Sequence, residues 1–221
     1  MNLDVYSDAV CPWCYIGKAR LGKALQVPDE AGNRAGEGVH VYWRAWQLYP
    51  EVPAAGMSKD EFNLRRWGTN DRDRIRKGFS RIEQEADAEG LPLRLGAAER
   101  MPNTRDAHRL NVLGHRLGVQ DAVVDALFDA YFVRGEDIGD LDTLAEIGGR
   151  AGLDATDART FLAQGGGDSE VEGELLAARD MEISSVPSFV FGGVFAIPGA
   201  QSAETLALII ARARGKLDAP A

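Results

Sequence analysis

The feature that most restricts the fold of this chain is a pair of cysteines three positions apart, Cys11 and Cys14. They are the only cysteines among its 221 residues. Residues 3–7, just before them, form a short apolar stretch with the length of a buried strand. Pro12 lies between the cysteines and suits the first turn of a helix, where its missing N–H would have no partner. The pattern predicts that both thiols lie where a strand passes into a helix.

A dithiol at the start of a helix is suited to redox chemistry. The free N–H groups and the dipole of the helix stabilise a thiolate there, which favours Cys11 as the attacking thiol. Cys14, one turn further along, should be more buried and should resolve a mixed disulfide. A structural disulfide that closes so short a loop would add little stability. From the residues alone, a pair of inert core cysteines remains an alternative hypothesis.

Pro187 forms a second signal, in the segment Ser185-Val186-Pro187-Ser188 that leads into an apolar run. One interpretation is a simple boundary between a turn and a strand, where a proline is permitted. The other is a cis bond between Val186 and Pro187 that lies against the dithiol and presents the Val186 backbone to an incoming peptide. The position of the segment in the element order favours the second interpretation.

Further strands are predicted from alternation and from turn residues. Residues 39–46 alternate and carry β-branched and aromatic side chains, which predicts a strand after the first helix. Residues 188–191 and 194–197 flank Gly192-Gly193, and two glycines between apolar runs indicate a hairpin with a two-residue loop. A final helix follows this hairpin.

Between these strands the sequence has helical periodicity for more than 100 residues, beginning near Ser58, whose Ser-x-x-Glu pattern is typical of a capping box. Asp140 and Asp154 are predicted to cap two further helices. The element order therefore predicts an α/β protein whose sheet domain is interrupted by an all-helical insertion. We place the sheet domain in residues 1–56 and 168–221, and the helical insertion domain in residues 57–167.

Composition excludes several functions. The chain has 34 acidic and 25 basic residues and a net charge of -9, so nucleic acid and anionic membrane surfaces are not expected partners. Neither a targeting segment nor a run of 18 apolar residues is visible, and we expect a cytoplasmic protein. Two cysteines and three scattered histidines do not complete a four-ligand zinc site. Neither a metal nor a bound cofactor is predicted.

Two segments are similar to a known family. Residues 8–18, which contain Cys11-Pro12-Trp13-Cys14, resemble the active-site segment of the DsbA-like thioredoxin family in its FrnE-like branch, which is related to 2-hydroxychromene-2-carboxylate isomerases. Residues 185–191 resemble the proline-containing segment of that family. Shorter similarities occur in residues 43–48, 103–110, 130–132, 152–154 and 197–201.

The resemblance implies a thioredoxin fold with a helical insertion, Cys11 as attacking thiol, Cys14 as resolving thiol and Pro187 as a cis-proline. It implies dithiol exchange with disulfide-containing proteins or small thiol substrates, a cellular thiol reductant or oxidant as partner, and a homodimer. The dipeptide Pro12-Trp13 departs from the Pro-His of strongly oxidising members. This chain also has no second cysteine pair, which some FrnE-like proteins carry near the C-terminus.

The candidate substrate-binding residues fall into two groups. Pro12, Trp13 and Val186 adjoin the dithiol. Asn103, Thr104 and His108 open a helix of the insertion that faces the dithiol in related sequences, and Trp46 would line a groove. The simpler interpretation is that Asn103 or Thr104 caps the helix, that His108 lies on the surface and that Trp46 belongs to the core.

The sequence thus predicts a thiol–disulfide oxidoreductase or isomerase. A glutathione-dependent isomerase or kappa-type transferase, similar to 2-hydroxychromene-2-carboxylate isomerase, is the first alternative. It would use glutathione as co-substrate, but it needs one nucleophile and not two. A polyketide-pathway accessory protein with an incidental dithiol is the second alternative.

Overall fold

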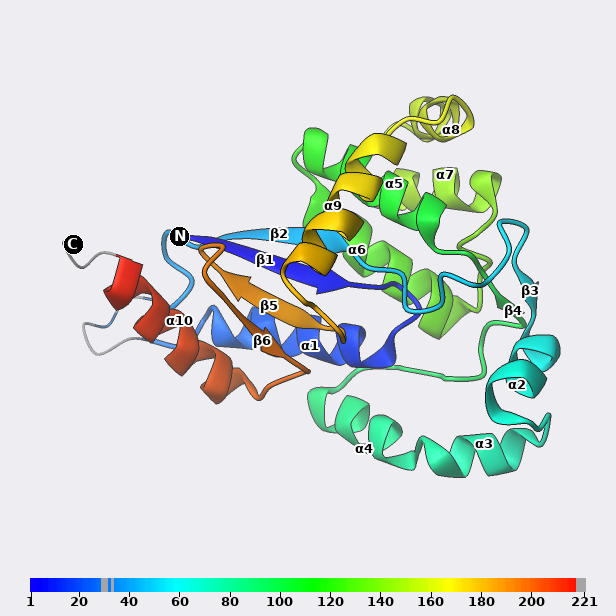
Figure 1. The fold of residues 1–221 in the computed structure, drawn as a ribbon, viewed down its shortest axis with the longest axis horizontal. Helices are drawn as coiled ribbons and strands as arrows, with labels where there is room; N and C mark the ends of the chain where they lie inside the picture. The colour runs from blue at the N-terminus through cyan, green and yellow to red at the C-terminus, as the bar shows by residue number, and fades with distance from the viewer. Residues whose placement is uncertain (29–31, 33, 218–221) are drawn as a thin grey trace.

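A computed structural model describes residues 1–28, 32 and 34–217. At its centre is a four-stranded mixed sheet with the strand order β2-β1-β5-β6 (Figure 1). Strand β1 pairs in parallel with β2 and antiparallel with β5, and β5 pairs antiparallel with β6. The strands span Asn2–Ser7 (β1), His40–Ala45 (β2), Ser188–Phe191 (β5) and Phe195–Pro198 (β6). These are the strands that the sequence predicts.

The β5–β6 hairpin differs from the prediction in its loop. Phe191 pairs with Phe195, so the loop has three residues, not two, and Val194 belongs to it. Gly192 and Gly193 both have positive φ angles, 58° and 71°. The rings of Phe191 and Phe195 stack with their centroids 5.2 Å apart. The stacked rings favour the strand register in which Phe191 lies opposite Phe195. A Gly-Gly pattern alone does not determine this register.

Helices surround the sheet. Helix α1 (Pro12–Ala24) packs with α10 (Ala203–Leu217), whereas α5 (Arg105–Arg116), α6 (Gln120–Asp129) and α9 (Asp168–Asp180) pack against β2 (Figure 1). The dithiol lies at the junction between α1 and β1, which is one of the two central strands of the sheet.

The outer edge of β2 is bonded to side chains of α6, in the insertion, and of α9. Gln120 Oε1 accepts from Trp43 N at 3.1 Å, and Gln120 Nε2 donates to Trp43 O at 2.9 Å. Glu174 Oε2 accepts from Ala45 N at 2.8 Å. These side chains occupy backbone groups that a further strand would need, so they hold the helices to the sheet and protect its edge.

The insertion is helical apart from one short ladder. Strands β3 (Met57–Ser58) and β4 (Arg100–Met101) pair antiparallel at its base, and two residues are too few to produce a recognisable strand pattern. Its remaining elements are α2 (Lys59–Trp67), α3 (Arg72–Gly78), α4 (Ser80–Glu89), the five-residue π-helix η1 (Ala130–Arg134), α7 (Leu141–Arg150) and α8 (Ala155–Ala163).

Three predicted helix starts are confirmed by their capping bonds. Ser58 Oγ accepts from Glu61 N at 3.1 Å, at the start of α2. Asp140 accepts from the backbone N–H of Thr143 at 2.8 Å, and Asp154 likewise caps α8. Each bond satisfies an N–H that has no partner within its own helix. Among the described residues, no helix is long and apolar enough to cross a membrane.

Candidate active site

The two thiols lie where the strand-to-helix pattern predicts. Cys11 is the N-cap residue of α1, with φ -91° and ψ 112°, and its N–H donates to Asp8 O at 3.0 Å. Cys14 follows one turn later, and its N–H donates to Cys11 O at 3.0 Å. Both cysteines are free thiols in this structure. The side chains are nearly covered, since Cys11 is 3% exposed and Cys14 is 0% exposed.

The environment of Cys14 favours its neutral form. Burial raises the pKa of the Cys14 thiol well above its usual value, and the adjacent Cys11 raises it further. Burial has this effect because a thiolate loses hydration inside the protein. Cys14 therefore holds its proton until another group removes it.

The proline segment closes over Cys11. The Val186–Pro187 peptide bond is cis, in agreement with the second interpretation of the sequence. Cys11 Sγ donates to Val186 O at 3.7 Å, which joins two segments 175 positions apart. The backbone of Val186 thus faces the first thiol of the dithiol motif.

Asn103 acts as a capping residue. Its Oδ1 accepts from Arg105 N at 3.0 Å and from Gln47 Nε2 at 2.9 Å, and its Nδ2 donates to Val52 O at 2.7 Å. Thr104 is 4% exposed and is the backbone N-cap of α5, but its side chain makes no capping bond. Asn103 and Thr104 therefore lie in the seam between the sheet and the insertion.

His108 is also part of this seam and does not lie on the surface, because only 5% of it is exposed. Its Nε2 lies 3.0 Å from Trp46 O and 3.5 Å from Asp8 Oδ1. Trp46 is half-buried, and its backbone carbonyl rather than its ring meets His108. The structure therefore brings His108 and Trp46 together through a backbone contact.

Asp8 is a residue that the sequence interpretation did not select as functional. It is 1% exposed, and its Oδ2 accepts from Leu48 N at 2.7 Å. Within the described part of the chain, Asp8 Oδ1 has no hydrogen-bond partner. An acidic residue between an apolar strand and Cys11 could have been noticed, since a carboxylate at such a position is costly to bury unless it has hydrogen-bond partners.

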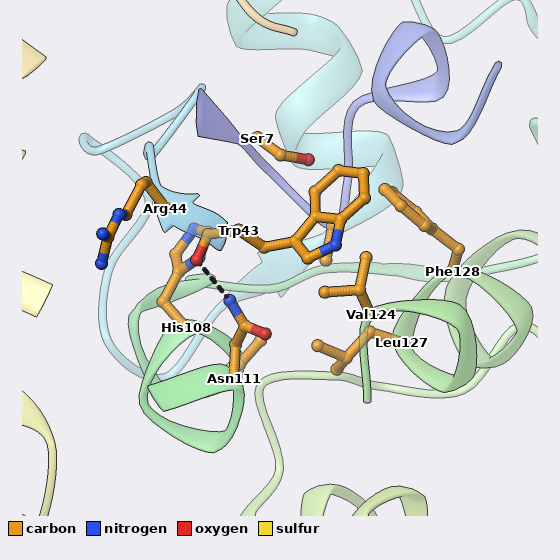
Figure 2. Close-up of a pocket in the computed structure, with 10 residues that line it drawn as sticks. Ser7, Trp43, Arg44, His108, Asn111, Val124, Leu127 and Phe128 are labelled. Carbon is orange, nitrogen blue, oxygen red and sulfur yellow. Dashed lines mark hydrogen bonds between the residues drawn. The ribbon is translucent and has the colours of Figure 1, made fainter. Parts of the chain in front are cut away.

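A small, mostly apolar cavity lies beside this seam. It has a volume of about 20 Å³, the size that one water molecule needs, and Ser7, His108 and Asn111 contribute polar groups to its lining. Figure 2 shows Asn111 below Trp43, where Asn111 Nδ2 donates to Trp43 O at 3.1 Å. The ring of Trp43 points into this cavity together with Val124, Leu127 and Phe128 (Figure 2).

A much larger cavity adjoins the dithiol segment. Its volume is about 660 Å³, and Val10 and Pro12 form part of its wall. Lys59 and Tyr131 also line it, and Lys59 Nζ donates to Tyr131 Oη at 2.7 Å. Burial lowers the pKa of Lys59 to about 8. Trp13, the other residue between the cysteines, is half-buried and packs against the hydrophobic core.

Lys59 is a second residue that the sequence interpretation did not select. It is the first residue of α2, directly after the capping residue Ser58. Positive charge is unfavourable at that end of a helix, where Asp and Glu are preferred. This conflict is a local signal that could have identified Lys59.

The described residues contain no group of three His, Cys, Asp or Glu side chains that could hold a metal ion.

The sequence matches the family model of the DSBA-like thioredoxin domain over residues 2–211. The crystal structure of a probable DsbA oxidoreductase from Streptomyces coelicolor is 29% identical and superposes with a TM-score of 0.87. That match covers 100% of this chain and 92% of the other. The uncharacterized protein YwbO of Bacillus subtilis strain 168 is 26% identical over 209 residues, which are 90% of each chain.

A structure of 2-hydroxychromene-2-carboxylate isomerase is 19% identical, with a TM-score of 0.66 and coverage of 98% and 96% of the two chains. At that identity the similarity concerns the fold.

Proposed function

The chain belongs to the DsbA-like thioredoxin family, and we propose from this that it is a thiol–disulfide oxidoreductase or isomerase that works by dithiol exchange through Cys11 and Cys14. The observation that carries the proposal is the position of Cys11, which caps α1 and whose Sγ faces Val186 O at 3.7 Å. Two thiols one helical turn apart and a backbone segment placed against the first of them are the parts that the exchange needs.

The reaction proceeds in two displacements. The thiolate of Cys11 attacks one sulfur of a substrate disulfide, forms a mixed disulfide and releases the other substrate sulfur as a thiolate, which takes up a proton. Cys14 then loses its proton and attacks the Sγ of Cys11, so that the second substrate thiol leaves and a Cys11–Cys14 disulfide forms. Two electrons pass from the protein to the substrate. A cellular thiol restores the dithiol by the reverse of these steps. When the protein oxidises a substrate dithiol, the same reverse steps reduce the Cys11–Cys14 disulfide and form the substrate disulfide.

The chemistry assigns different roles to the two cysteines. Cys14 is fully buried with a raised pKa, which keeps it as a thiol until the mixed disulfide has formed beside it. The Val186 backbone, which accepts from Cys11 in the reduced protein, would hold the substrate backbone or another polar group in the mixed disulfide. We place Pro187 with Cys11 and Cys14 in the catalytic group for this reason.

The setting of this activity is also a proposal. We propose a FrnE-like protein that acts in the cytoplasm as a homodimer, with no nucleic-acid or membrane partner. Its acidic charge, -9 in total, supports the exclusion of polyanionic partners. Its substrates would be disulfide-containing proteins or small disulfides, and it would need neither a metal nor a bound cofactor.

Insulin reduction in the presence of dithiothreitol tests the proposal. The wild-type protein should accelerate the precipitation of insulin chains, and Cys11→Ser should return the rate to that of dithiothreitol alone. Serine preserves the size and backbone of the site, so a loss reports on the sulfur. Equal rates for the two proteins would mean that the dithiol is incidental, as in an accessory protein.

A glutathione-dependent isomerase is the second candidate, and the large cavity next to the dithiol segment favours it. In that case glutathione would be a co-substrate held beside Cys11, and one nucleophile would suffice. Titration of the Cys14→Ser variant with glutathione separates the two functions. Saturable binding, with no acceleration of insulin reduction by either the wild type or this variant, would support the isomerase. Acceleration by the wild type that is lost in this variant supports dithiol exchange.

A further inference from the structure

We propose that the cavity of about 660 Å³ beside the dithiol binds a low-molecular-weight organic acid, with an apolar body in the cavity and its acid group on Lys59. One part of the inference rests on the proposed function: if the protein works by dithiol exchange, its substrate would be a small disulfide that carries an acid group.

The cavity has the size and lining of a ligand site. Pockets for small molecules generally have volumes of roughly 300–1,000 Å³ and mostly apolar walls with a few polar groups. Pro12 brings one wall of this cavity next to Cys11, while Cys11 itself is only 3% exposed. A small molecule in this cavity would therefore lie beside the segment that carries the dithiol, although neither cysteine belongs to the lining. Its apolar walls include Phe62, Trp67, Phe79, Leu95 and Phe132.

Lys59 is the polar group that such a ligand would meet. Its Nζ donates to Tyr131 Oη at 2.7 Å and lies over the rings of Phe62 and Tyr131, 5.9 Å and 5.2 Å from their centroids. In the described part of the chain, no carboxylate lies within salt-bridge distance of Lys59. Arg65, Arg72 and Arg76, by contrast, each form an ion pair. A half-buried ammonium without a counter-ion has lost part of its hydration, and an incoming anion would offset this cost.

The other basic side chains at the cavity are less suited to this role. Arg72 lies 3.5 Å from Asp60, and Arg76 lies 3.0 Å from Glu83. Both arginine side chains are more than 70% exposed, so water screens their charge. Arg94 also lines the cavity and has no ion pair in the described part of the chain, but it is exposed to water, so Lys59 is the one of the four basic lining residues that is half-buried.

The charged residues of the lining also favour an anion. The lining contains four basic residues and two acidic residues, a net charge of +2 within a chain of net charge -9. Acidic surfaces elsewhere repel an anionic ligand, whereas this region attracts it. The local field therefore directs an organic acid towards the cavity.

The π-helix η1 shapes the wall opposite Lys59. It contributes Tyr131 and Phe132 to the cavity, and Phe132 O accepts from Arg94 N, in the loop that also lines the cavity, at 3.0 Å. A π-turn costs stability compared with a regular helix and is found most often at functional sites. Here it aims the Tyr131 hydroxyl at Lys59 while its backbone holds the loop.

Binding of matched probes to the full-length Cys11→Ser protein tests the inference without relying on thiol chemistry. The probes are 2-naphthoate and 2-naphthamide, which share an aromatic body but differ in charge. We expect one saturable site for the naphthoate, and at least about tenfold weaker binding of the neutral amide, as for the loss of a charge-assisted hydrogen bond. In a Lys59→Met background, naphthoate binding should weaken at least about tenfold and amide binding should stay within about twofold.

Two variants control this measurement. Lys77→Met removes one positive charge from α3 at an exposed position outside the cavity lining, and it should leave naphthoate binding within about twofold. Lys59→Arg should restore binding in part, because it retains the charge. Equal weakening in Lys59→Met and Lys77→Met would attribute the effect to the overall field and overturn the assignment of Lys59. Equal weakening of the acid and the amide in Lys59→Met would indicate damage to the cavity and would also overturn it.

Exchange kinetics then connect the cavity to the dithiol. With the otherwise wild-type protein, Lys59→Met should lower the rate constant for 5,5′-dithiobis(2-nitrobenzoate) more than for the neutral 4,4′-dithiodipyridine. A protein that binds naphthoate through Lys59 but fails in insulin reduction would retain the binding site and lose the proposed function. A protein that reduces insulin but binds naphthoate equally well with and without Lys59 would keep the proposed function, and the proposed ligand site would be overturned.

Discussion

A Cβ atom added at Gly17 would lie 2.9 Å from Cγ of Pro187, so helix α1 and the proline segment meet at a position that has no room for a side chain. The same atom would lie 3.6 Å from Cζ of Phe189, on strand β5. Gly17 is one and a half turns beyond Cys11, and this contact sets the distance between the dithiol helix and the segment that carries Val186 O. The glycine is therefore required for close packing inside a helix, where glycine is otherwise unfavourable.

Gly17→Ala should disturb the active site, whereas Gly22→Ala on the same helix should not. Gly22 is exposed and has no atom near an added Cβ, so its alanine variant should raise the free energy of unfolding by about 0.5–1 kcal/mol. Gly17→Ala receives the same helical gain but must displace Pro187, so it should be less stable than Gly22→Ala and slower in insulin reduction. Urea unfolding and the insulin assay measure both effects. Equal stability and activity of the two variants would show that the contact has no such role.

Cys14→Ser should accumulate mixed disulfides. Cys11 can still attack a disulfide in this variant, but the buried thiol that releases the captured group is absent. Incubation with oxidised glutathione followed by mass spectrometry of the intact protein should show one stable adduct. Cys11→Ser is the matched control and should show none, because Cys14 is 0% exposed. An adduct on Cys14 in that control would reverse the assigned roles.

Lys59 should make stability depend on pH above neutrality. Burial lowers the pKa of Lys59 to about 8 in the folded protein, against 10.5 in the unfolded chain. Between these values the unfolded chain binds more protons, so the free energy of unfolding rises with pH across this window. Below pH 8 both states are protonated, and the full cost of the buried charge is present. Burial also raises the pKa of Tyr131, so its hydroxyl stays neutral throughout.

The measurement is the difference between the wild type and Lys59→Met in urea unfolding from pH 7 to 10.5. We expect the wild type to gain up to about 3 kcal/mol relative to the variant. Other titrating groups are common to both proteins and cancel in the difference. A difference that stays constant with pH would contradict a depressed pKa for Lys59.

Glu182 is the one residue other than glycine with a positive φ angle, 55°, in the described part of the chain. It follows α9, where its N–H donates to Arg179 O at 2.9 Å, and its side chain is exposed. An L-residue in this conformation costs about 1–2 kcal/mol, and glycine does not have that cost. Glu182→Gly should therefore raise the free energy of unfolding by roughly 0.5–1 kcal/mol, after the entropy of glycine in the unfolded chain is counted.

Thermal or urea unfolding of Glu182→Gly measures this gain, and Glu182→Ala serves as its control. Alanine removes the same charge and side chain but retains the strained conformation, so it should not stabilise. If both variants stabilise the protein equally, charge rather than backbone geometry is responsible.

Local sequence signals predicted much of the fold. Apolar runs placed β1 and β5, alternation placed β2, and Ser58, Asp140 and Asp154 marked helix starts. These signals are reliable because capping and alternation involve residues within a few positions of one another. The register of the β5–β6 hairpin was wrong by one residue, since it depends on cross-strand packing as well as on the turn.

The candidate site divides in the same way. The helix start beside Cys11 and the segment around Pro187 could be recognised from the sequence, whereas the seam at His108 and the cavity around Lys59 could not. His108 meets Trp46 O across 62 positions, and Lys59 meets Tyr131 across 72. No local pattern contains information about pairs so far apart in the chain.

The sequence by itself determined that two thiols stand at the start of a helix, because strand, proline and helix lie within one short segment. Only the tertiary structure decided what faces them. The approach of Val186 O to Cys11, and the enclosure of Lys59 without a carboxylate, result from packing between segments more than 70 positions apart. Burial and electrostatic environment are properties of that packing, and they give otherwise ordinary side chains their chemistry.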